Sequence, residues 1–336
     1  MYVTSGWGIH DERWTSALRT LGFAPTIVRL GIDVHTSSAL RAQVERDSAG
    51  GIPVLAGPVN TVAVHLRNLP TRVVGLSWGF DIHQMGDRPW LTDLDGLIVD
   101  SSATSALARA AGVDAEAITF LPWGVDLGVF HPAGPHADVT RWQVPRGART
   151  LLSLRAHEPL YRVSDILDGF AQVSQEFPDV HLIVGHSGSL TPELQERAHQ
   201  HGISDRTHFV GTLSEDELPE VLRAVDVYVS ASEVDGTSGT LLQALACGTS
   251  VVASDTPGNQ PWIIPGETGF VFTTGDAAAL AQTLRSRLTS TNEEILALKA
   301  RGRLLVEREA DWQRNLPRLA QALGAPGSSD PGLTSP

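Results

Sequence analysis

The chain has 336 residues, of which 42% are apolar, enough to fill two hydrophobic cores. Its 38 acidic residues outnumber 25 basic ones, and the formal net charge of −13 argues against binding nucleic acid or an anionic membrane surface. A single cysteine, Cys247, excludes an internal disulfide framework and favours a reducing compartment.

Short runs of Val, Ile and Leu alternate with amphipathic stretches, which is the pattern of a parallel sheet covered by helices. In the first half we expect strands and helices at these positions: strands 26–28, 61–64, 73–76, 96–99 and 118–121, and helices 12–21 and 103–111. A second series follows a stretch rich in Pro, Gly and His at 132–147: strands 151–154, 181–184, 208–210, 227–229 and 250–253, with helices 164–176, 192–201, 215–224 and 238–247.

Two successive series of this kind predict two Rossmann-like α/β domains. We expect the first domain at 1–138 and the second at 148–308, with 132–147 as the linker. A C-terminal helix at about 309–323, containing Trp312, is expected to cross back onto the first domain, and 324–336 to form a disordered tail.

Neither a membrane span nor a signal peptide is predicted. No apolar run approaches the roughly 20 residues needed to cross a bilayer. The N-terminus lacks the basic-then-apolar order of a signal peptide. We therefore expect a cytoplasmic protein without integral membrane contact.

Residues 232–248 contain the most informative pattern, a loop rich in Gly, Ser and Thr followed by a helix that Gly248 would end. The amides of Ser238, Gly239 and Thr240 would point outward at the start of that helix. There the helix dipole favours a phosphate group or an electron-rich sugar oxygen. Taken alone, the segment fits an ordinary strand-to-helix turn equally well.

The same segment resembles the signature of family-4-type glycosyltransferases, in which two acidic residues flank seven others and are followed by Ala-x-Ala-Cys-Gly-x-x-Val-Val. Asp235 stands at the first acidic position and Gln243 at the second. The resemblance extends over about residues 2–320 and is strongest from 150 to 285. It implies the GT-B fold, in which two Rossmann-like domains have parallel sheets facing across a cleft.

The resemblance also implies roles for charged residues. Arg155 would hold the donor diphosphate, and Arg162 would replace a lysine of the family, because Lys299 is the only lysine of the chain. Asp235 would hold sugar hydroxyls. Gln243 stands where a carboxylate usually accepts two hydrogen bonds from the nucleotide ribose, whereas an amide accepts one and donates one.

Further residues match glycine turns and loops of the family that lie near the nucleotide or the acceptor. The complete set of expected donor-binding residues is Gly6, Gly8, Gly185, Gly211, Thr212, Leu213, Gly236, Thr237, Ser238, Gly239, Thr240 and Gln243. Acceptor contacts are expected from His10, Asp11, Trp78 and Asp81. Trp78 stands where many members carry a histidine, so no catalytic histidine is carried over to this chain.

The implied reaction moves a hexose-type sugar from a nucleoside diphosphate, with UDP favoured and GDP open, to a hydroxyl of a small acceptor with retained configuration. We expect neither a cofactor nor a metal ion, because Asp93 and Asp95 lack a second group of ligands and no zinc spacing occurs. Three alternatives remain open: a nucleotide-sugar epimerase, an enzyme that couples a nucleotide-activated cyclitol, and a degenerate protein that binds a nucleotide sugar without turnover.

Overall fold

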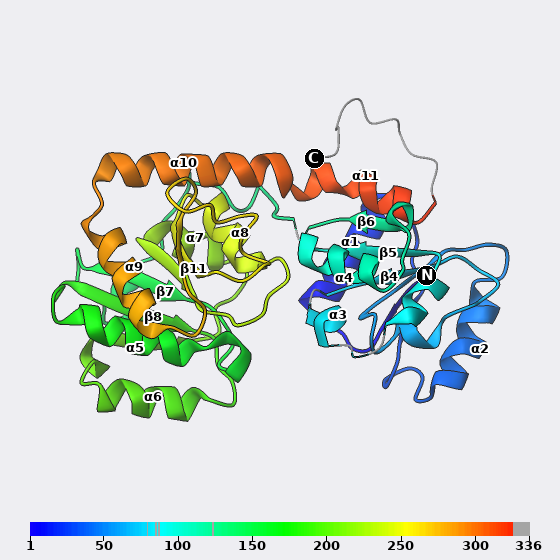
Figure 1. The fold of residues 1–336 in the computed structure, drawn as a ribbon, viewed down its shortest axis with the longest axis horizontal. Coiled ribbons are helices and arrows are strands. Elements are labelled where there is room, and N and C mark those ends of the chain that lie inside the picture. Colours follow the sequence, from blue (N-terminus) through cyan, green and yellow to red (C-terminus); the bar gives the residue numbers. More distant parts are fainter. Residues whose placement is uncertain (79, 85, 87, 123, 325–336) are drawn as a thin grey trace. The chain divides into compact units, whose positions relative to one another are not determined.

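The computed structural model describes residues 1–78, 80–84, 86, 88–122 and 124–324. The chain divides into two compact units (Figure 1). The first unit comprises Met1–Trp123 and Trp312–Pro336, and the second comprises Gly124–Asp311. Of the predicted tail at 324–336, residues 325–336 lie outside the described residues.

The first unit contains a parallel sheet in which the described strands follow the order β2-β1-β3-β4-β5-β6. Its strands are β1 (Tyr2–Thr4), β2 (Ile27–Arg29), β3 (Val54–Ala56), β4 (Val73–Leu76), β5 (Gly96–Val99) and β6 (Ile118–Phe120). Its helices are α1 (Ile9–Thr20), α2 (Ser37–Asp47), α3 (Phe80–Gln84), α4 (Ser102–Ala110) and α11 (Trp312–Ala322).

Alternate side chains of these strands fill two cores, one on each face of the sheet. Val3 and the strand side chains on the same face of the sheet pack with α2 and α4. Tyr2 and the strand side chains on the opposite face pack with α1 and α11. The last helix joins the first unit through the rings of Trp14 and Trp312, whose centroids lie 5.6 Å apart in an edge-to-face arrangement. The sheet is therefore covered on both faces, as parallel sheets require.

The second unit contains a parallel sheet in the order β12-β11-β10-β7-β8-β9. Its strands are β7 (Arg149–Ser153), β8 (Val180–Gly185), β9 (Thr207–Gly211), β10 (Val227–Ser230), β11 (Ser250–Ser254) and β12 (Phe270–Phe272). Its helices are α5 (Val163–Ser174), α6 (Thr191–Gln200), α7 (Leu218–Ala224), α8 (Gly239–Ala246), α9 (Ala277–Thr289) and α10 (Asn292–Glu309).

The two faces of this sheet carry different sets of helices. Leu151 packs with α5, α6 and α9, whereas its neighbour Leu152 packs with α7, α8 and α10. Figure 1 shows α5 and α6 together on one side of the second unit. Each unit is thus a parallel sheet between helical layers, and the predicted pair of Rossmann-like domains is confirmed.

The predicted strand at 61–64 is wrong. This stretch forms a helical turn that ends in a short 3₁₀ helix, Ala63–His65, and the strand of this region is β3. The Val62 amide donates to the Pro58 carbonyl at 2.9 Å, a bond within a helical turn. Val62 and Ala63 are fully buried, and a short apolar run of this kind does not separate a strand from a buried helical turn.

The division of the units also differs from the predicted boundary at 138–148. Residues 124–147 belong to the second unit, where Val125, Phe130 and Val144 are buried in the core beside β7 and α8. Helices α2, α3 and α9 and strand β12 were not predicted. Helix α2 carries few apolar residues, and the apolar run of β12, Phe270–Phe272, is only three residues long. Other short 3₁₀ turns lie at Pro89–Asp93, Ala115–Ala117, Val139–Trp142, Pro159–Tyr161 and Ser204–Arg206.

A pair of histidines joins β8 to the edge strand β9. The rings of His181 and His208 are stacked with centroids 5.2 Å apart, and Nδ1 of His181 lies 2.9 Å from Nε2 of His208. Burial and the charge of Arg206 lower the pKa of His181, against the opposing charge of Asp179. Burial and His181 lower the pKa of His208, while a hydrogen bond with the Trp142 backbone opposes the shift. The fold therefore favours the neutral pair.

We expect the melting temperature to fall when the pH is lowered from 7.5 to 5.5. Since both pKa values are lower in the folded chain, the unfolded chain binds more protons as the pH falls through the ordinary imidazole value of about 6.5. Thermal unfolding of His208→Gln should show a smaller fall. His199→Gln, which changes an exposed histidine of α6, is the control, and equal falls in all three proteins would contradict the expectation.

Candidate active site

The strand order of the second unit creates a switch point between β7 and β10. From β7 the chain adds β8 and β9 on one side, and then β10, β11 and β12 on the other. In open α/β sheets, ligands bind outside the carboxyl ends of the strands at such a point. The segments that leave β7 and β10 there carry Arg155 and Asp235, respectively.

Arg155 is held at this point by three side chains. Its Nη2 lies 2.9 Å from Oδ2 of Asp235, and its Nη1 donates to Oγ of Ser238 at 3.0 Å. The guanidinium carbon lies 4.2 Å from the ring centroid of Tyr161, a cation–π contact. The Arg155 side chain is only 11% exposed, so its guanidinium is held in one position and one orientation.

The Arg155–Asp235 pair is charged and buried. Burial raises the pKa of the Asp235 carboxyl, and the charge of Arg155 opposes that shift. Burial disfavours the charge of Arg155, but Asp235 together with the phenols of Tyr228 and Tyr161 outweighs this effect, so the pKa of Arg155 lies above its ordinary value. Each partner therefore depends on the other to remain charged away from water.

Helix α8 begins beside this pair. Ser238 is its N-cap, and the Ser238 hydroxyl oxygen accepts from the Leu241 amide while it also accepts from Arg155. The first amides of a helix, here those of Gly239 and Thr240, have no carbonyl partner inside the helix. A guanidinium and a helix N-terminus thus come together, which is the arrangement that binds a phosphate group.

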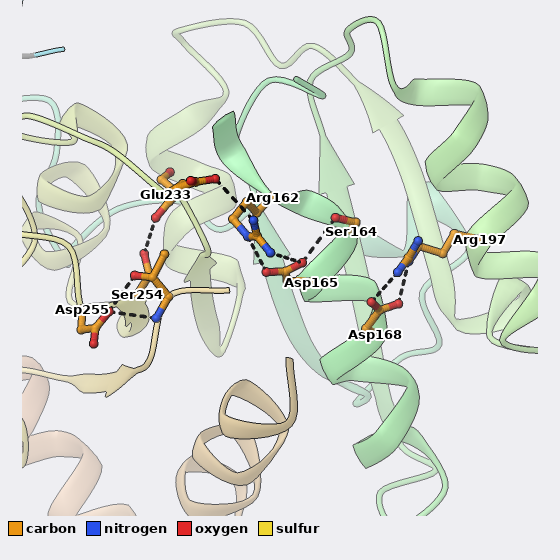
Figure 2. Close-up of polar contacts among 10 residues, drawn as sticks. Arg162, Ser164, Asp165, Asp168, Arg197, Glu233, Ser254 and Asp255 are labelled. Carbon is orange, nitrogen blue, oxygen red and sulfur yellow. Dashed lines mark hydrogen bonds and ion pairs between the residues drawn. The ribbon is translucent and has the colours of Figure 1, made fainter. Parts of the chain in front are cut away.

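The end of β11 supports the loop before α8. Figure 2 shows Ser254 beside the segment that carries Glu233, and the Ser254 hydroxyl donates to the Ser232 carbonyl at 2.7 Å. A few residues further on, Gly258 packs directly against the loop backbone. A Cβ atom at Gly258 would overlap the carbonyl oxygens of Asp235 and Gly236. Only glycine fits there without displacing the loop that carries Asp235.

Arg162 lies in a separate group of charges (Figure 2). Its backbone is left-handed, with φ 46°, and its Nε donates to Asp165 at 2.7 Å. Its Nη1 lies 3.3 Å from Glu233, whose side chain is 55% exposed. The structure thus pairs Arg162 with two carboxylates, whereas it brings Arg155 to the start of α8.

The remaining predicted residues of the second unit follow the carboxyl ends of neighbouring strands. Gly185 ends β8, and Gly211 ends β9 with φ 72°, a left-handed conformation that favours glycine. Thr212 and Leu213 follow β9, while the other predicted positions lie on the loop and first turns of α8: Gly236, Thr237, Ser238, Gly239, Thr240 and Gln243.

Tyr161 and Glu233 were missed as site residues. Tyr161 lies under the guanidinium of Arg155, and Glu233 pairs with Arg162. Their position in the sequence could have indicated them, since Tyr161 precedes Arg162 directly and Glu233 lies two residues before Asp235.

The predicted residues of the first unit cluster at the ends of β1 and β4. Gly6 and Gly8 follow β1, and Asp11 accepts from the Gly8 amide and from the Tyr2 hydroxyl, each at 2.9 Å. Asp11 is 2% exposed, so its carboxylate supports the start of α1.

Asp81 has a comparable supporting role. It is fully buried and accepts from the Val59 amide at 2.9 Å and from the Ser77 hydroxyl at 2.6 Å. Burial raises the pKa of Asp81, and these hydrogen bonds oppose the shift. His10 is exposed, with its ring centroid 5.7 Å from that of Trp78, so these two rings are the accessible part of the predicted acceptor group.

Residues 138–303 match the family described as glycosyl transferases group 1. These residues, 166 of the 336, are similar to that family. The phosphatidyl-myo-inositol mannosyltransferase of Mycobacterium leprae is 34% identical over 205 residues, which cover 59% of this chain and 50% of the relative. The alpha-monoglucosyldiacylglycerol synthase of Streptococcus pneumoniae is 30% identical over 175 residues, covering 51% and 40%. The chain thus spans about half the length of these curated relatives.

Solved structures share the fold over nearly the whole chain. Anabaena HepE in complex with UDP-glucose superimposes with a TM-score of 0.80 at 16% identity, covering 96% of this chain and 99% of HepE. Sucrose-phosphate synthase from Thermosynechococcus elongatus gives 0.77 at 19% identity, covering 95% and 97%. The predicted GT-B class is therefore confirmed. Among the described residues, no helix has the length and apolar character of a membrane span.

We expect Gly258→Ala to lower the melting temperature, because the added methyl group must displace the backbone at 235–236. Overpacking of this kind costs about 1–3 kcal/mol, which corresponds to several degrees in a domain of this size. Gly239→Ala is the matched control, since a Cβ atom there meets nothing within 4 Å. Thermal unfolding of both variants tests the expectation, and a Gly258→Ala protein as stable as Gly239→Ala would contradict it.

Proposed function

We propose that the chain is a retaining glycosyltransferase. It moves a hexose from a nucleoside diphosphate, most simply UDP, to a hydroxyl group of a small acceptor. The observation that carries the proposal is the buried guanidinium of Arg155 at the start of α8, at the switch point of a sheet whose residues are similar to the glycosyl transferases group 1 family. The bound UDP-glucose of HepE supports a UDP-linked donor.

In the proposed reaction, the bond between the anomeric carbon and the diphosphate breaks as a bond to the acceptor oxygen forms on the same face. Negative charge builds on the departing diphosphate. Arg155 and the amides of 238–240 would stabilise that charge in a site from which water is largely excluded. A phosphate oxygen of the donor would take the acceptor proton, so no protein nucleophile and no metal ion are required.

Asp235 is proposed to position Arg155. A guanidinium held on one side by Asp235 and on another by Ser238 needs no reorientation when the diphosphate departs. The carboxylate oxygen that does not face Arg155 would remain to accept from hydroxyl groups of the transferred sugar.

Arg162 is proposed as a second phosphate contact that is recruited when the donor binds. Its contact with Glu233, at 3.3 Å between a partly exposed arginine and a carboxylate 55% exposed, is the weaker of its two pairs. A diphosphate would replace Glu233 while Asp165 continues to orient the guanidinium. In the first unit, His10 and Trp78 would contact the acceptor, and Asp11 and Asp81 would support the surrounding loops.

A nucleotide panel is the first test of the donor. We expect one of UDP, GDP and ADP, most simply UDP, to raise the melting temperature in the presence of EDTA. A ligand at 100 times its Kd stabilises a protein by about 2.7 kcal/mol. If none of the three nucleotides raises the melting temperature, with or without added magnesium, the proposed donor site is wrong.

Arg155→Ala should lower turnover by roughly 100-fold, because one preorganised charge contact to the leaving group is lost. Release of the nucleotide from the donor that binds, with and without candidate acceptors, is the measurement. Because this variant leaves Asp235 unpaired, the double variant Arg155→Ala, Asp235→Asn is measured beside it. Arg285→Ala, which removes an exposed ion pair with Glu176, is the control. Turnover of Arg155→Ala within threefold of the unmodified protein would contradict the assignment.

A further inference from the structure

The first unit contains an open cavity of about 400 Å³ beside α2, which we call the α2 cavity. Its lining consists of Arg41 from α2, four residues between β3 and β4, and Asp93 just before β5; the four are Val64, His65, Arg67 and Asn68. The predicted acceptor residues instead follow the carboxyl ends of β1 and β4. The α2 cavity is therefore separate from that predicted group.

Backbone carbonyls hold two guanidinium groups at this cavity. Nη1 of Arg41 donates to the Arg67 carbonyl at 2.7 Å, and Nη2 of Arg41 donates to the Asn68 carbonyl at 3.1 Å. Nε of Arg67 donates to the Val64 carbonyl at 2.9 Å. A guanidinium carries five N–H groups, so both arginines retain donors for a further partner.

The carboxylates beside these arginines neutralise them only loosely. Nη1 of Arg67 lies 3.4 Å from Oδ2 of Asp93, and Nε of Arg41 lies 3.3 Å from Oε1 of Glu45. Most other ion pairs of the described residues have contacts between 2.6 and 2.9 Å. Exposed pairs contribute little free energy, so an anion that approaches the guanidinium groups more closely can displace these carboxylates.

His65 adds a third basic group to the cavity wall. Its side chain is half-buried, and no hydrogen bond to its imidazole is found among the described residues. A neutral imidazole offers one N–H donor, and a protonated one offers two. Two fixed guanidinium groups and an imidazole without a hydrogen-bond partner among those residues thus line one cavity, in a chain whose formal net charge is −13.

We propose that the α2 cavity binds the phosphate group of a phosphate monoester. Such a group carries a charge of about −1.5 to −2 near pH 7 and three acceptor oxygens. The planar fork of arginine matches phosphate oxygens with two parallel hydrogen bonds. A volume of about 400 Å³ falls within the range of small-molecule sites and leaves room for the organic part of the ester.

The test is titration calorimetry of the full chain with glycerol 3-phosphate, with glycerol as the uncharged control. We expect saturable binding with a Kd of about 1 mM or lower, and no binding of glycerol. The double variant Arg155→Ala, Asp235→Asn, which alters the start of α8, should bind glycerol 3-phosphate with the same Kd. Retained binding in this variant separates the α2 cavity from the proposed donor site.

Two substitutions should change the Kd in opposite directions. Arg67→Gln should raise it at least tenfold, because hydrogen bonds from a charged donor are lost. Asp93→Asn should lower it about threefold, because a carboxylate no longer competes for Arg67. A purely structural role for the arginines predicts no such gain. Arg285→Gln, which breaks the exposed ion pair with Glu176, is the control and should leave the Kd unchanged.

Binding to vesicles distinguishes a soluble ester from a lipid. Phosphatidylcholine vesicles with and without phosphatidic acid present the same phosphate group on a membrane, and co-sedimentation that Arg67→Gln abolishes would identify the lipid as its source. Melting temperatures show whether each variant is folded. If Arg67→Gln does not fold, His65→Gln replaces it and should raise the Kd about threefold. Absence of binding by both probes, or a Kd that neither the Arg67 or His65 variant nor Asp93→Asn changes, would overturn the proposal.

Discussion

The candidate site depends on one buried ion pair, between Arg155 after β7 and Asp235 after β10. The pair joins the two strands on either side of the switch point, so the position of each loop constrains the other. Removing one partner would leave an uncompensated charge away from water, which typically costs 3–5 kcal/mol. The same contact that orders these loops therefore also aims a permanent positive charge at the start of α8.

Other contacts of the second unit serve this pair. Tyr161 covers one side of the guanidinium, and Ser238 links it to the helix start. Gly258 allows the segment after β11 to lie directly on the backbone of Asp235 and Gly236. Rigid strands thus carry the site, and the loop atoms that would meet a diphosphate are fixed from three sides.

Much of this architecture follows from local sequence, because buried parallel strands are short runs of Val, Ile and Leu between helices with one apolar face. The strand predicted at 61–64 was wrong because Val62 and Ala63 are buried within a helical turn. Over only four residues, apolar periodicity does not distinguish a strand from such a turn. The pattern at 232–248 located the start of α8. Which charged side chains form ion pairs, however, is determined by tertiary structure. Sequence alone therefore revealed neither the partners of Arg155 nor those of Arg162.

The first unit is discontinuous in sequence, because α11 contributes the rings and aliphatic side chains of Trp312, Leu316 and Leu319 to a core that otherwise consists of residues before 123. During synthesis, nearly two hundred further residues are added before α11 is available to cover the face of the sheet that holds Tyr2 and Leu55. Such a late, long-range contact slows folding and prolongs the exposure of apolar surface. The second unit is contiguous, and its last helix, α10, ends at Glu309, so the nascent chain contains the whole second unit before it contains the helix that covers the first.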